Sequence, residues 1–86
     1  MHDTFLNENL YEAIVNLCNE HSIARILNLT ISVNTHSHIS EESIREHFID
    51  RNSSLIGHWT NIFVEKEEIE PLTATIELID GENFNK

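Results

Sequence analysis

The chain has 86 residues, of which 15 are acidic and 5 are basic, so its formal net charge at pH 7 is −10. Such an acidic chain argues against binding to nucleic acid or anionic lipid, because both need clustered lysine and arginine. One cysteine, Cys18, excludes an internal disulfide, and no apolar run reaches the ~20 residues of a membrane span or follows the plan of a signal peptide. We therefore expect a cytoplasmic protein with one small domain, in which Cys18 fills space in the core.

The chain begins with the tripeptide Met1-His2-Asp3, whose nitrogen atoms can bind a metal ion. The amine of Met1, the backbone nitrogen of His2 and its imidazole can close fused chelate rings around one ion. The amide or carboxylate of Asp3 can complete a square, and square-planar sites rich in nitrogen suit Ni(II) or Cu(II). Amines and imidazoles have ordinary pKa values of about 7.7–8.0 and about 6.5, so we expect the affinity to fall steeply below roughly pH 6. The other interpretation is a solvated start to the first helix.

Hydrophobic periodicity then predicts five elements in close succession. A first helix is predicted over residues 4–21, because apolar residues recur there at helical spacing: Leu6, Leu10, Ile14 and Leu17. Strict alternation predicts a half-buried strand over residues 27–34. A second helix is predicted from Ser40, a good N-cap, to about Asn52, with Ile39 packing onto Ile44.

The last two predicted elements are strands over residues 59–64 and 73–79. The order is therefore helix, strand, helix, strand, strand. Two helices on one face of a three-stranded mixed sheet would bury both apolar stripes of the helices and the inward side chains of the strands. We predict an α+β fold in a single small domain over residues 1–80, followed by an acidic flexible tail over residues 81–86.

Several segments together resemble a known family. They are the tripeptide Met1-His2-Asp3, the helix ending near His21, and the stretches 21–26, 29–34 and 37–40. In this order they resemble the hydrogenase and urease nickel-incorporation proteins of the HypA/HybF type, which begin Met-His-Glu. The match needs no insertion or deletion up to about Glu67.

The chain departs from the family's pattern in two places. After its second strand the family carries a zinc domain built on two Cys-x-x-Cys pairs, whereas this chain has only residues 67–72 and one cysteine, so we predict no structural zinc. Beside the first strand, family glycines are replaced by Ser32 and Asn34, and the glutamate that follows them by Thr35. An acid near the start of the family's second helix, a candidate extra ligand in some members, corresponds to Ser40.

The resemblance implies a nickel metallochaperone. In this interpretation Met1, His2 and Asp3 hold Ni(II), and transient contacts deliver it to hydrogenase or urease maturation proteins or to a GTPase that transfers the metal. The resemblance also places the loop with His36 and His38 near the N-terminus, which makes His38, and with it His36, a candidate for an added ligand. A solvated pair of histidines is the alternative.

A second class of function stays open, because the zinc domain is missing. The chain can be a metal-independent protein–protein interaction module descended from the same family, in which the acidic surface or an exposed sheet edge binds the partner. An enzyme is not predicted, since the sequence has no glycine-rich phosphate loop, no Gly-x-Ser-x-Gly elbow and no recognisable Cys–His arrangement. We expect a monomer or a weak homodimer.

Overall fold

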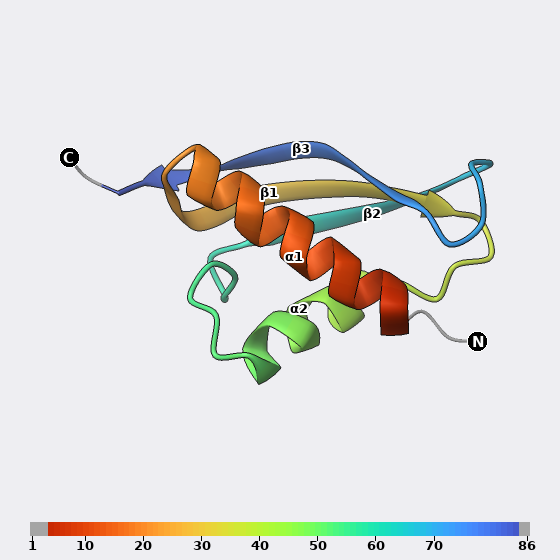
Figure 1. Cartoon of the computed structure of the whole chain (residues 1–86), viewed down its shortest axis with the longest axis horizontal. Coiled ribbons are helices and arrows are strands. Elements are labelled where there is room, and N and C mark those ends of the chain that lie inside the picture. Colours follow the sequence, from red (N-terminus) through yellow and green to blue (C-terminus); the bar gives the residue numbers. More distant parts are fainter. Residues whose placement is uncertain (1–3, 85–86) are drawn as a thin grey trace.

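The computed structural model describes residues 4–84. Its elements are α1 (Thr4–Glu20), β1 (Ile23–Asn34), α2 (Glu41–Asp50), β2 (Asn61–Glu67) and β3 (Ala74–Asn83). They form one small α+β domain and confirm the predicted order of helix, strand, helix, strand, strand (Figure 1).

The sheet is mixed and has the strand order β2-β1-β3, so β1 is the central strand. β2 runs parallel to β1, with Leu29 opposite Ile62, and β3 runs antiparallel, with Leu29 also opposite Ile79. Parallel neighbours need a crossover connection, and α2 lies within the crossover from β1 to β2. The register between β1 and β3 shifts at three places.

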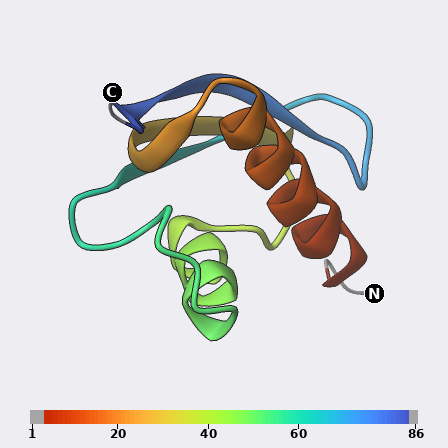
Figure 2. The same ribbon diagram turned by 60° about the vertical axis from the view of Figure 1, so that its left-hand side comes forward.

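Both helices lie on the same side of the sheet, as predicted (Figures 1 and 2). The apolar stripe of α1 and the inward side chains of β1 meet in a core whose most buried members include Ile14, Leu29, Ile31 and Val33. From α2 the core receives Ile44 and Phe48. Such burial of one helix stripe against one sheet face accounts for the fold.

Cys18 belongs to this core, which confirms its predicted packing role. Burial removes the Cys18 thiol from water and raises its pKa above the ordinary value. The neutral thiol is therefore the favoured form in the folded protein, as expected for a structural and unreactive cysteine.

The start of α2 confirms the predicted N-cap. The Ser40 hydroxyl accepts a hydrogen bond from the backbone nitrogen of Ser43 at 3.1 Å, and the Ser43 hydroxyl accepts one from the backbone nitrogen of Ser40 at 2.9 Å. This reciprocal pair satisfies two backbone donors that a helix start leaves unpaired. Glu41 and Glu42 follow in the first turn, where the helix dipole favours negative charge.

The end of the chain differs from the prediction of a flexible tail over residues 81–86. β3 continues to Asn83, with Gly81 opposite Ile26 and Glu82 opposite Arg25. An Arg25–Glu82 ion pair of 2.8 Å and the pairing with the early part of β1 hold this segment. The local sequence is polar and contains glycine, so only the long-range pairing with β1 makes it a strand. Of the predicted tail, residues 85 and 86 lie outside the described part.

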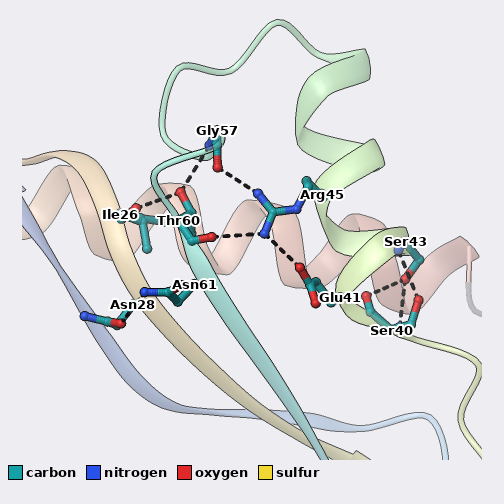
Figure 3. Close-up of polar contacts among 9 residues, drawn as sticks. All are labelled: Ile26, Asn28, Ser40, Glu41, Ser43, Arg45, Gly57, Thr60 and Asn61. Atoms are coloured by element: carbon teal, nitrogen blue, oxygen red, sulfur yellow. Dashed lines mark hydrogen bonds and ion pairs between the residues drawn. The ribbon is translucent and has the colours of Figure 1, made fainter.

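Arg45 connects α2 to the segment that leads into β2 (Figure 3). Its guanidinium donates hydrogen bonds to the backbone oxygens of Gly57 at 2.7 Å and Thr60 at 3.0 Å, and it forms an ion pair with Glu41 at 2.9 Å. The Thr60 hydroxyl in turn donates to the backbone oxygen of Ile26 at 2.7 Å. The crossover is thereby attached to both α2 and β1.

Replacing Arg45 with methionine is expected to lower the free energy of unfolding by about 1.5–3 kcal/mol, because two partly buried carbonyl oxygens lose a charged donor. Urea denaturation monitored by circular dichroism measures the change. The matched control is Glu41→Gln, which removes an exposed ion pair and one favourable charge in the first turn of α2 and should cost less than about 1 kcal/mol. Equal losses in the two variants would contradict the assigned role of Arg45.

Candidate functional site

The predicted metal ligands Met1, His2 and Asp3 lie outside the described residues. α1 begins at Thr4, so the tripeptide immediately precedes the first helical residue. α1 starts at the end of the molecule where β1 finishes and the connection to α2 sets out (Figure 1). The described residues that bear on the predicted site are therefore those that fix the start of α1 and those of the connection itself.

A polar cluster between the helices fixes the first turns of α1. One carboxylate oxygen of Glu8 lies 3.1 Å from Nε2 of His47 and also accepts a hydrogen bond from the guanidinium of Arg51. Beside this contact the ring of Tyr11 packs edge-on against Phe48, with the ring centroids 4.8 Å apart. Glu8 and Tyr11 thus hold the N-terminal half of α1 against the C-terminal half of α2.

The connection between β1 and α2 carries His36 and His38, both of them exposed. It opens with a tight turn, because the backbone nitrogen of Ser37 donates to the backbone oxygen of Asn34 at 2.9 Å. The Asn34 side chain caps the same turn by accepting from the backbone nitrogen of His36 at 2.8 Å. His36 therefore sits in a turn.

The two histidines line different hollows. His36 borders a small one that it shares with Pro71 and Leu72 of the β2–β3 connection. His38 borders a larger open hollow of about 580 Å³ between the β1–α2 connection and β2. Of the two predicted added ligands, His38 is thus the one that faces β2 and the start of α2.

The hollow beside His38 carries charged groups of both signs, supplied by Glu41, Glu65 and Lys66. The Lys66 ammonium donates a hydrogen bond to the backbone oxygen of Ser37, which ties β2 to the connection. Within residues 4–84, no three histidine, cysteine or acidic side chains lie close enough together to hold a metal ion. A role of His38 as a ligand stays a prediction.

The structure also shows an exposed apolar surface that the sequence pattern alone does not predict. On the face of the sheet away from the helices, Phe63 of β2 and Leu78 of β3 are 55% and 48% exposed. In a strand, Phe63 points to the face opposite that of its neighbours Ile62 and Val64. The sequence does not show which residue of another strand lies beside Phe63, because that depends on the strand register, and so it does not predict this surface.

The chain matches no protein-family model, no curated protein and no solved structure with which it was compared. The resemblance to nickel-incorporation proteins thus stays a prediction, based on the residues named above. Among residues 4–84, neither helix has the length and hydropathy needed to cross a membrane.

Proposed function

We propose that this protein is a cytoplasmic nickel metallochaperone, which holds Ni(II) through Met1, His2 and Asp3 and passes it to a hydrogenase or urease maturation partner. The observation that carries the proposal is the tripeptide itself, placed directly before the first residue of α1. It combines an amine, an imidazole and backbone amides in a spacing that suits a square-planar ion. The proposal requires that Met1 carry the free α-amine.

The order of elements supports the proposal, because it is the order that the resemblance to the nickel-incorporation family implies. β2 ends at Glu67 and β3 begins at Ala74, so six residues, 68–73, join the strands on either side of β1. The family inserts its zinc domain at this point. The short connection is consistent with a nickel-carrying domain that has lost this insertion.

The proposed transfer of Ni(II) to a partner protein is based on the position of the site at the end of the chain. Ligands at the end of a chain leave the metal open to attack by the ligands of a second protein, such as a maturation protein or a GTPase. His38 would supply a supplementary ligand from the β1–α2 connection. The ion is then held by groups that compete with protons, so acidification also favours its release.

The test is the number of protons that one bound Ni(II) ion displaces. At pH 7 an α-amine is mostly protonated and an imidazole is about one-quarter protonated, so with one or two amide protons the tripeptide should release about two to three protons. Calorimetric titrations in buffers of different ionisation enthalpy measure this number. Two imidazoles without amine or amide ligands would release only about half a proton, and that result would contradict the proposal.

A further inference from the structure

The face of the sheet that points away from the helices is uncovered within the part of the chain that the structure describes. Figure 3 shows Asn28 and Asn61 on the near side of the sheet while α1 passes behind it. The sheet is mixed, and sheets that contain antiparallel strands can leave one face to solvent. Whether this bare face can dock a partner therefore depends on the side chains that it presents.

An apolar row crosses the middle of this face. Thr30 of β1 lies opposite Phe63 of β2 on one side and opposite Leu78 of β3 on the other. Thr30 alternates with Leu29 and Ile31, both fully buried toward the helices, so all three members of the row point away from the core. About half of each large side chain, Phe63 and Leu78, is exposed. We call Thr30, Phe63 and Leu78 the outer row.

Carboxylates border the outer row on both sides. On one side Asp80 accepts a hydrogen bond from the amide of Asn28 at 3.0 Å. On the other, Glu77 accepts one from the hydroxyl of Ser32 at 3.1 Å, and Glu65 lies opposite Ser32 in the register. The partners that orient Asp80 and Glu77 are neutral groups, so their negative charge is not compensated by these contacts.

The basic side chains of the described chain are already engaged elsewhere. Arg25 pairs with Glu82, Arg45 with Glu41, and Arg51 with Glu8. Lys66 donates to the backbone oxygen of Ser37. A chain with a net charge of −10 thus presents an apolar row bordered by acids on its bare face, and the complementary surface is apolar in the middle and basic at its edges.

We infer that the bare face docks a basic amphipathic helix of a partner protein. Three strands spaced about 4.8 Å apart make a face roughly 10 Å wide, which matches the diameter of one α-helix with its side chains. The apolar stripe of the helix covers the outer row, and lysine or arginine residues on its flanks meet Asp80, Glu77 and Glu65. A second copy of this chain is a poor occupant because both copies carry the same high negative charge. The inference does not depend on nickel binding.

The probe is a synthetic helical peptide of about five turns, roughly 18 residues, with leucine along one stripe and lysine elsewhere. A scrambled peptide of equal composition, without the stripe, controls for non-specific charge attraction. In nuclear magnetic resonance titrations of the ¹⁵N-labelled protein, we expect the striped peptide to shift the amides of Thr30, Phe63 and Leu78, with smaller effects on α1 and α2. Shifts confined to the helices, or equal binding of the two peptides, would overturn the inference.

A composition-matched pair of double variants completes the test. Phe63→Ser with Leu78→Ser removes both large apolar side chains of the outer row, and we expect it to weaken peptide binding at least about tenfold. Phe84→Ser with Leu72→Ser removes the same two residue types at positions that are 62% and 71% exposed, and should change the affinity less than about threefold. Equal affinities of the two variants would overturn the inference, as would a homodimer in which the outer row is buried. His2→Ala should bind the peptide as the unmodified protein does, so a failure of the nickel proposal would leave this result unaffected.

Discussion

Replacing His2 with alanine is expected to weaken Ni(II) binding by more than about 100-fold. Loss of a group that merely supports a metal ligand costs about 10–100-fold, and the imidazole that His2→Ala removes would itself be a ligand. Calorimetric titration of protein that begins with an unmodified Met1 measures the affinity. The unfolding midpoint should not change, because the buried core of the described chain begins only at Leu6.

Two other histidines provide the controls. His58 packs edge-on against Trp59, with 5.2 Å between the ring centroids, in the segment between α2 and β2. His58→Ala should leave Ni(II) affinity unchanged within about twofold, since the proposed site does not use it. His38→Ala should have an intermediate effect of about tenfold, as expected for a supplementary ligand. If His2→Ala binds nickel as tightly as His58→Ala, the tripeptide is not the site.

Replacing Gly81 with alanine is expected to lower the free energy of unfolding by about 2–3 kcal/mol. A Cβ atom at this position would overlap the backbone oxygen of Arg25 and would lie only 3.0 Å from Cγ2 of Ile23. Both obstacles belong to β1, so β1 and β3 must separate locally. An 86-residue domain has a total stability of roughly 4–13 kcal/mol, so this is a substantial fraction.

Gly57→Ala is the matched control for Gly81→Ala. There the new Cβ would overlap the outer atoms of the Trp59 ring, which is a side chain that is only partly buried. Rotation of the ring can relieve the overlap, so we expect a loss below about 1 kcal/mol together with a change in tryptophan fluorescence. Guanidinium denaturation of both variants measures the losses. A Gly81→Ala protein as stable as Gly57→Ala would contradict the close pairing of β3 with β1.

Local patterns predicted the elements whose stability is set locally. The helical spacing of Leu6, Leu10 and Ile14 and the reciprocal cap at Ser40 and Ser43 each involve neighbours along the chain. The strict alternation of β1 likewise identified the face that meets the helices. The two-helix, three-stranded arrangement then followed from the need to bury these stripes together.

Features that depend on strand register could not be predicted in this way. Alternation with Ile31 and Val33 places the polar Ser32 on the outer side of β1, yet Ser32 is fully buried and donates a hydrogen bond to Glu77 of β3. The extension of β3 to Asn83 depends on pairing with residues near the start of β1. The outer row also depends on strand register, since Phe63 of β2 and Leu78 of β3 are brought to either side of Thr30 only by the pairing of their strands with β1.

The candidate site likewise has one part that the sequence predicts and one part that depends on the fold. The chelating capacity of Met1-His2-Asp3 is a property of adjacent residues, so the sequence suffices to predict it. The surroundings of His36 and His38 depend on the turn that the Asn34 side chain caps, and on hollows formed with the β2–β3 connection and with β2. Sequence spacing alone could not place these two imidazoles.

The most direct measurement is the visible absorption spectrum of Ni(II)-loaded protein, compared between the chain with a free α-amine on Met1 and the same chain with Met1 acetylated. The nickel proposal predicts a yellow square-planar band at one equivalent of Ni(II) for the first protein. It predicts loss of this band for the second, because acetylation removes the amine that closes the chelate ring with the backbone nitrogen of His2. The same band at the same nickel concentration in both proteins would contradict the proposal.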